Sequence, residues 1–426
     1  MKKYLLVMLL IIAVALSACT ADSNSEQLSE NDEDNAEETV QNQPASYTQI
    51  SEASLSVDSL QYLGAFRLPE DGSREKEMFS YGGEALCYNP ANDSLFITGH
   101  NWYTYVAEIS IPDIISSKDV SALNQSERLN GFIDIKGRLF DEWTMEIPRV
   151  GMEVVGDKLF FCFGEHYEED TEKGTHGYTD LSLSIPSKVC VVGDYLYATN
   201  DYMFAIPEEY IAYFGWNDLM TGRFRDGGWS GMGPSLFAVS TKDIIDAENN
   251  EKIQAVPLIK YEDSFNGDSG KKMENYSHAD SWTGGAFVSC EAGSAILFLG
   301  THGYGNTWYG FANGVVYPTD GDENAVYPEV PDYPYDERGW WNDDFRSCIA
   351  FYSTEDIINV FSGQINPADI QPYEFADITQ YMLVERDETV MQYLGAAAYD
   401  QENNRLFLLE LMADGDKPVV HVFTFE

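Results

Sequence analysis

Basic residues are scarce in this chain of 426 residues. Lysine and arginine together number 25, against 71 aspartates and glutamates, and the formal net charge is −46. A phosphate backbone would be repelled by such a protein, so the charge excludes a general nucleic-acid binder. The same charge disfavours polyanionic ligands, unless basic residues gather at one place.

Long apolar runs are also scarce, because only one is present, at the N-terminus. Two lysines precede an apolar stretch from Tyr4 to Leu16, which leads into Ser-Ala-Cys19. The run is shorter than the roughly 20 residues that a membrane span needs, and small residues before a cysteine are typical of a lipobox. We therefore expect a signal peptide over 1–19, lipidation of Cys19, and a lipoprotein held outside the cytoplasm, at the cell membrane or the outer membrane, by its lipid anchor alone.

Residues 20–48 contain almost nothing apolar. Positions 20–46 hold eight acidic residues and no basic ones, a composition typical of a disordered tether. Without the two lysines of 1–19 and these eight acids, about −40 of the formal charge of −46 remains on residues 49–426. We predict one monomeric domain over 49–426.

Cysteines are too few and too scattered for a disulfide framework. Five remain after Cys19, and Cys87, Cys162, Cys190 and Cys290 fall in predicted strands among apolar neighbours. This pattern predicts that they act as small buried hydrophobic residues, with one disulfide or one metal ligand as the alternative.

One hairpin design recurs along the domain. Each copy is a strand, a turn of Gly-Asp, Asn-Asp or similar residues, and a strand with Leu-Phe or Leu-Tyr that ends in a polar group. The five copies are 84–100, 152–166, 189–200, 285–302 and 394–410. Such a repeat favours an array of equivalent units over a pair of unrelated β-sandwiches.

A second element follows three of the hairpins, at 106–115, 236–245 and 349–358. Each predicts an outer strand followed by a short helical turn with Ile-Ile. A hairpin with outer strands makes a four-stranded blade, so the predicted fold class is all-β, a β-propeller of five to seven blades. The strand 60–66 lies far from any hairpin partner, and we expect it to close the ring by joining the last blade.

Polar residues recur at the strand ends of this repeat. In a propeller the second strand of a blade ends on the face where the first begins, so these residues should surround the central channel. They are His100, His166, Asn200, His302 and Glu410 at strand ends, and Tyr81, Arg149, Lys188, His278, Asp280 and Tyr393 at strand starts. A functional rim is one interpretation, and ordinary solvated strand ends are the other.

Two further blocks should lie on that face. The glycine-rich block 221–235 carries Arg223, Arg225 and Trp229, and either arginine could bind a carboxylate through two hydrogen bonds. It lacks the spacing of a dinucleotide-binding loop. The block 301–309 places Tyr304 and Trp308 beside His302, as in a sugar-binding platform or an ordinary loop.

A metal site is a separate hypothesis. His278 and Asp280 precede an inner strand whose hairpin partner ends at His302, so the three side chains could meet at one strand end. Two imidazoles and a carboxylate suit zinc, with Cys348 as a possible fourth ligand.

Three motifs together resemble secreted β-propeller proteins related to the ulvan lyases. They are Tyr81-Gly-Gly-Glu-Ala, the block Gly-Arg-Phe-Arg-Asp-Gly-Gly-Trp229, and Gln371-Pro-Tyr-Glu. The resemblance implies a seven-bladed propeller, a His and Tyr pair for proton transfer, an arginine that neutralises a uronate carboxylate, and a structural zinc or calcium ion.

Carried over to this chain, the resemblance gives alternatives for each role. The arginine is Arg225 or Arg223, the histidine is His166 or His100, and the tyrosine is Tyr210 or its neighbour Tyr213. The activity expected is polysaccharide cleavage by β-elimination, with Asn200, Trp229, Tyr304 and Trp308 contacting the glycan. The alternative is a non-catalytic surface propeller that binds a glycan or a protein.

Overall fold

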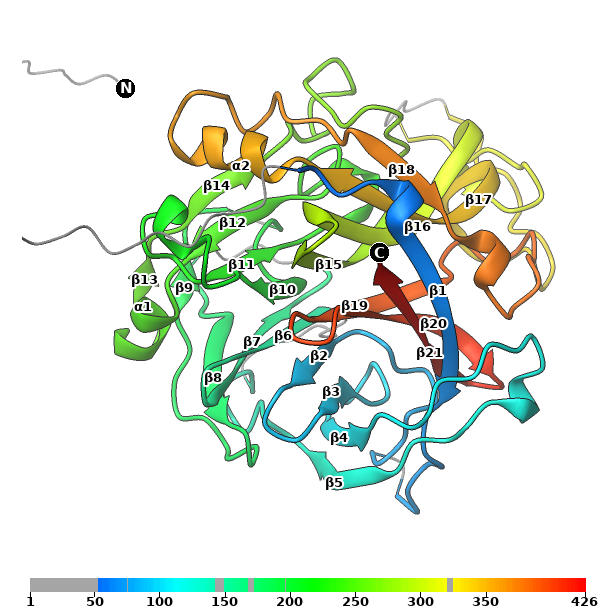
Figure 1. Cartoon of the computed structure of the whole chain (residues 1–426). Helices are drawn as coiled ribbons and strands as arrows, with labels where there is room; N and C mark the ends of the chain where they lie inside the picture. Colours follow the sequence, from blue (N-terminus) through cyan, green and yellow to red (C-terminus); the bar gives the residue numbers. More distant parts are fainter. Residues whose placement is uncertain (1–52, 75, 142–148, 168–171, 196, 320–324) are drawn as a thin grey trace, which may run out of the picture. The chain divides into compact units, whose positions relative to one another are not determined.

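The computed structural model describes residues 53–74, 76–141, 149–167, 172–195, 197–319 and 325–426. In this part of the chain, small β-sheets form a five-bladed β-propeller (Figure 1). Cys19 and the predicted tether lie outside the described residues, so the predicted lipidation stays a prediction. No helix in the described ranges is long and apolar enough to cross a membrane.

The blades follow one another along the chain. Their strands are, for blade 1, β2 (Leu86–Asn89), β3 (Ser94–Thr98), β4 (Val106–Ser110) and β5 (Arg128–Ile133); for blade 2, β6 (Arg149–Val155), β7 (Lys158–Gly164) and β8 (His176–Asp180); for blade 3, β10 (Tyr202–Ala205), β11 (Leu219–Gly222), β12 (Leu236–Val239) and β14 (Val256–Ile259); for blade 4, β15 (Ser281–Cys290), β16 (Gly293–Phe311), β17 (Arg338–Tyr352) and β18 (Glu374–Asp377); and for blade 5, β19 (Leu394–Asp400), β20 (Arg405–Asp414), β21 (Lys417–Phe425) and β1 (Leu60–Arg67).

Short elements connect these strands. They are the 3-10 helices η1 (Val57–Ser59), η2 (Val120–Ala122), η3 (Ile211–Phe214), η4 (Asp226–Gly228) and η5 (Thr379–Tyr381), the α-helices α1 (Thr241–Asp246) and α2 (Thr354–Phe361), and a parallel pair of two-residue strands, β9 (Val191–Val192) and β13 (Lys252–Ile253).

The N-terminal strand closes the ring, as the sequence predicted. β1 pairs antiparallel with the C-terminal strand β21, and the sheet order is β1-β21-β20-β19. The inner strands contact one another in the order β2, β6, β10, β15, β19 and back to β2. The five blades therefore form a closed ring, with β1 as the outer strand of the last blade.

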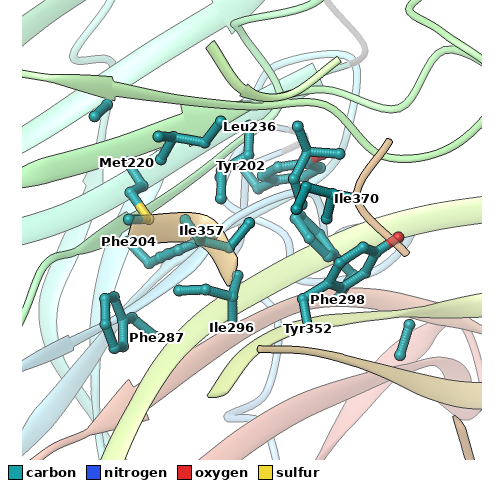
Figure 2. Packing of buried hydrophobic residues seen from close by; sticks show 14 of the residues in the cluster. Tyr202, Phe204, Met220, Leu236, Phe287, Ile296, Phe298, Tyr352, Ile357 and Ile370 are labelled. Atoms are coloured by element: carbon teal, nitrogen blue, oxygen red, sulfur yellow. The ribbon is translucent and has the colours of Figure 1, made fainter. Parts of the chain in front are cut away.

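The core is divided among the five interfaces between neighbouring blades. One apolar cluster joins each pair, and the largest joins blades 3 and 4 through residues such as Phe204, Phe287 and Tyr352 (Figure 2). Both faces of a blade are covered, so strands such as β3 are buried along their whole length. Such strands therefore have continuous apolar sequences. They lack the alternation of apolar and polar residues that is typical of a sheet with one solvent-exposed face.

The cysteines fit this core. Cys87, Cys162, Cys190 and Cys348 are buried free thiols and Cys290 is half-buried. The prediction of small buried hydrophobic residues is confirmed for three of the four cysteines it named.

The predicted hairpin 189–200 is wrong. Blade 3 instead begins with the hairpin of β10 and β11, and residues 197–201 form a turn followed by bends. Two backbone carbonyls of this segment accept hydrogen bonds from side-chain hydroxyls instead of from a neighbouring strand. Ser235 donates to Ala198 O (2.6 Å), and Thr221 donates to Thr199 O (2.5 Å). Asn200 therefore lies before the inner strand of its blade.

The predicted helical turns are confirmed at two of three positions. Ser240 and Ser353 accept hydrogen bonds from the backbone N–H three residues on, which caps α1 and α2. Residues 111–116, directly after β4, form no helical turn, and Ser110 Oγ instead accepts from Glu127 N (2.9 Å). Ile115 there bridges to Ala65 of β1.

Candidate functional site

The loop after β11 is fixed where it leaves and rejoins the sheet. β11 ends at Gly222, where an added Cβ would lie 2.0 Å from the carbonyl oxygen of Ser235. The Ser235 hydroxyl accepts from the backbone N–H of Arg223 (3.1 Å), and its oxygen also lies 2.7 Å from the carbonyl oxygen of Arg223. The side chains of Arg223 and Arg225 leave this closed loop toward blade 2.

Arg223 joins blades 2 and 3 and is fully buried. Its Nη2 donates to the carbonyl of Glu165 (2.9 Å), its Nη1 donates to Asn200 Oδ1 (3.2 Å), and the guanidinium lies 5.6 Å from the ring centre of Tyr197. Arg223 and Asn200 therefore join the rim of blade 3 to that of blade 2.

Arg225 and His166 form the chemical centre of the site. Arg225 donates from Nε to the carbonyl of His166 (3.0 Å), and its Nη2 lies 3.1 Å from His166 Nε2. A guanidinium has no acceptor, so Nε2 accepts this hydrogen bond and the imidazole proton is on Nδ1. His166 thus presents a basic nitrogen beside a fixed positive charge.

The surroundings keep this imidazole neutral. Burial lowers the pKa of His166 to about 4, and the charges of Arg225, Arg149 and Arg223 act in the same direction. Burial and the neighbouring Arg223 also lower the pKa of Arg225 to about 10, which leaves its guanidinium charged at neutral pH.

Aromatic side chains flank the arginine. The guanidinium of Arg225 lies 5.1 Å from the ring centre of Tyr167 and 5.2 Å from that of Trp229. Trp229 also contacts Tyr167 (5.7 Å between centroids) and Phe265 (5.2 Å). Tyr167 and Phe265 are 45% and 54% exposed, so the aromatic surface beside Arg225 is open to solvent.

An acidic side chain of the same loop pairs with Arg225. Asp226 Oδ1 contacts Arg225 Nη1, and the Asp226 side chain is 51% exposed. Nη2 thus faces His166 Nε2, and Nη1 faces both the Asp226 carboxylate and the Asp226 backbone carbonyl (3.4 Å). Nε stays bound to the backbone and fixes the orientation of the guanidinium.

Charged side chains also surround the mouth of the central channel, at the starts of three inner strands. Arg149 Nη1 lies 3.6 Å from Glu84 Oε2. Burial raises the pKa of Glu84 to about 7 against the opposing effect of Arg149, and burial likewise raises the pKa of Asp201. Sequence reasoning missed Glu84 and Asp201, although a charged residue just before an inner strand was the available signal.

Among the described residues, the pocket behind this mouth, between β2, β6, β10, β15 and β19, has a volume of about 10 Å³. This space is about that of one water molecule and is too small for a sugar.

The other predicted proton-transfer residues lie elsewhere. His100 contacts Tyr81 (5.7 Å between centroids), Trp102 and Tyr103 on blade 1. Tyr210 is fully buried against Phe287, beyond the end of β10 that lies away from Gly222, and Tyr213 is its neighbour. The tyrosine next to His166 is Tyr167, with 4.6 Å between the ring centroids.

Two of the three predicted metal ligands meet, but as a buried pair. Asp280 Oδ1 lies 2.7 Å from His302 Nδ1 and also accepts from the backbone N–H of Gly303. His278 instead contacts Tyr276 through Nδ1 (3.2 Å) and Asp268 through Nε2 (2.8 Å). His278, Asp280 and His302 therefore do not form one group, and within the described ranges no three His, Cys, Asp or Glu side chains are grouped to hold a metal. The zinc or calcium ion stays a prediction.

Tyr304 and Trp308 lie on blade 4, and the contacts described here for them are with residues other than Arg225. Tyr304 packs on His302, and Arg346 lies 4.4 Å above its ring. Trp308 lines a separate pocket of about 440 Å³ together with Arg386, Tyr393 and several carboxylates.

No protein-family model matches this chain, and no curated protein sequence is significantly similar to it. The resemblance to ulvan lyase propellers thus gains no support from these comparisons. The seven blades that it implied are also a point of disagreement, because the described residues form five. What the chain does must therefore be argued from the side chains of the rim.

Proposed function

We propose that the rim of blades 2 and 3 binds a uronate-containing glycan and cleaves it by β-elimination. The observation that carries the proposal is the contact of Arg225 with His166, a fixed cation beside a neutral imidazole, under an exposed aromatic surface. A carboxylate that takes Nη1 and Nη2 of Arg225 would displace Asp226 and free His166 Nε2. It would bind to a guanidinium that is held in place close to Arg149 and Arg223, of which Arg149 is itself paired with Glu84.

The reaction assigns a role to each group. His166 Nε2 removes the proton from the carbon next to the carboxylate, whose negative charge Arg225 stabilises. The electron pair forms a carbon–carbon double bond as the bond from the β carbon to the glycosidic oxygen breaks. That oxygen leaves with a proton from the Tyr167 hydroxyl, which later recovers a proton from water, while His166 returns its proton to solvent.

The pH dependence of kcat/KM is expected to report the pKa of His166. The neutral imidazole is the active form, and its fraction rises as the pH rises through the pKa. Because the pKa of free His166 is about 4 rather than the usual 6.5, kcat/KM should fall only as the pH drops through about 4. An acidic limb centred on the ordinary value would show that His166 is not the base. Initial rates in buffers of constant ionic strength measure this limb.

Asp226→Asn is expected to strengthen uronate binding. The substitution keeps the side-chain volume and removes the charge that competes for Arg225 Nη1. Since the carboxylate is half exposed, the gain should be modest, about two- to fivefold in Kd. Weaker binding of the variant, measured by calorimetry, would mean that Asp226 positions Arg225 for the ligand instead of blocking it.

A second candidate function is glycan binding without cleavage. The exposed aromatic surface favours it as much as it favours a lyase. The distinguishing experiment incubates the protein with a panel of uronate polysaccharides and follows the near-ultraviolet absorbance of unsaturated uronates. Product formation supports elimination, whereas binding without product supports the non-catalytic alternative.

A further inference from the structure

Two strands of blade 4 extend past the rim as an arm. β15 begins at Ser281, opposite Thr301, but β16 and β17 continue to pair up to Phe311 and Arg338. One face of this arm carries aromatic rings in series. Tyr309 contacts Trp340 (5.3 Å between centroids) and Tyr317 (6.2 Å), and Tyr317 contacts Tyr327 (5.0 Å).

The arm contacts the loop 223–235, which carries Arg225, at Gly227. An added Cβ there would lie 3.0 Å from Trp340 Nε1 and 3.7 Å from Trp229 Cδ1, so the glycine lies between the two indoles. Its φ of 69° is a conformation that favours glycine, and its N–H donates to the carbonyl of His278 (3.1 Å). The ring of His278 in turn stacks on Trp340, with centroids 4.3 Å apart.

These contacts join two aromatic groups into one row, the aromatic track. It comprises Tyr167, Phe265, Trp229, Trp340, Tyr309, Tyr317 and Tyr327. The rings are half-buried or exposed, and they lead from Arg225 outward along the arm.

Charge is divided unequally along this track. Arg149, Arg223 and Arg225 lie together at its inner end, where each contributes to the electrostatic field at His166, and the carboxyl groups of Glu84, Asp201 and Asp226 lie beside them. Asp226 and Asp268 are half exposed near the junction. Residues 325–345 of the arm then hold six acids, Glu329, Asp332, Asp336, Glu337, Asp343 and Asp344, and one base, Arg338, which covers the ring of Tyr317.

We propose that the aromatic track binds the neutral sugars that continue from a uronate held at Arg225. The ligand is then a polymer in which uronates are separated by neutral sugars. Sugar faces stack on aromatic rings, whereas further carboxylates along the arm would meet acidic side chains. This inference rests on the proposed carboxylate site at Arg225, and it specifies the class of glycan that the site accepts.

Native gel electrophoresis with polysaccharide in the gel tests the track without requiring cleavage. Two probes differ in charge spacing: gellan, a linear glycan with neutral sugars between its glucuronates, and polygalacturonate, in which every sugar is charged. The wild type should be retarded more by gellan. Trp340→Ala should weaken gellan binding by about three- to tenfold.

Matched variants separate the possible outcomes. Tyr317→Ala, farther along the arm, should also weaken gellan binding, and it covers the case in which Trp340→Ala unfolds. Trp216→Ala should bind as the wild type does, because Trp216 is 76% exposed but follows η3, outside the track. Stronger retardation by polygalacturonate, or wild-type binding by both arm variants, would overturn the track. Wild-type binding by Arg225→Ala together with weak binding by Trp340→Ala would instead refute the carboxylate site and leave the track in place.

Discussion

His166→Gln is expected to lower kcat/KM on a uronate glycan by about 10²- to 10⁴-fold, the usual loss when a general base is removed. The glutamine amide oxygen can accept the hydrogen bond from Arg225 Nη2 that His166 Nε2 accepts now. The orientation of the arginine, and with it glycan binding, should therefore survive the substitution. The measurement is the initial rate of unsaturated product, with binding followed separately.

His100→Gln is the matched control for this loss. His100 was an equal candidate from the sequence and also follows an inner hairpin, but it contacts Tyr81, Trp102 and Tyr103 rather than Arg225. We expect its rate to equal that of the wild type. Equal losses in the two variants would show that the rim histidines act on stability rather than on chemistry.

Gly222→Ala is expected to destabilise the domain by about 3 kcal/mol or more, near the upper end of overpacking effects. The new methyl group would lie 2.0 Å from Ser235 O and 2.5 Å from the ring of Tyr202. Neither neighbour can move freely, because the Tyr202 hydroxyl donates to Ser235 O (2.7 Å) and the Ser235 hydroxyl is bound to Ala198 O. Denaturant unfolding of purified protein measures the change in the free energy of unfolding.

Gly131→Ala provides the comparison for backbone effects of a glycine substitution. A Cβ at Gly131 would meet no atom within 4 Å, so its effect should stay within about 0.5 kcal/mol. If Gly222→Ala is as stable as this control, the close approach of Gly222 to Ser235 does not constrain the loop 223–235.

The architecture could be predicted from the sequence because each blade repeats the same hairpin chemistry. Short turns between strands that carry a buried Leu-Phe pair identify four of the five inner hairpins, and three of these four turns contain Asn-Asp, Gly-Asp or Asn-Asn. The failure at 189–200 has a specific cause. The pattern there is the same, but the hydroxyls of Thr221 and Ser235, distant in sequence, bind the backbone that would otherwise pair.

The site could be predicted only in part. The positions of residues at strand ends predict that they lie on the rim, but they do not predict which side chains contact one another. Arg225 and His166 were both candidates, and they are in contact. Tyr210 and Tyr213 precede the arginine block in the sequence, but they follow β10 and lie beyond the end of that strand that is away from Gly222. Tyr167, adjacent to His166 in sequence, was the better signal.

The predicted metal ligands show the same limit of prediction from strand ends. The meeting of Asp280 with His302 was predicted correctly from their strand ends. Whether such a pair binds a metal depends on a third ligand, and the side chain of His278 contacts Asp268 instead. Spacing along the sequence does not determine this choice of partner.

The most direct test of the carboxylate site compares two ligands that differ only in one group. A uronate oligosaccharide and its carboxyl-reduced analogue, in which the carboxylate is a primary alcohol, are titrated calorimetrically into the wild type and Arg225→Ala. Loss of a charge-assisted contact of roughly 1.5–3 kcal/mol predicts that the wild type binds the uronate about ten- to a hundredfold more tightly than the analogue, and that Arg225→Ala does not distinguish the two ligands. Equal binding of both ligands by the wild type would contradict recognition of uronates at this rim.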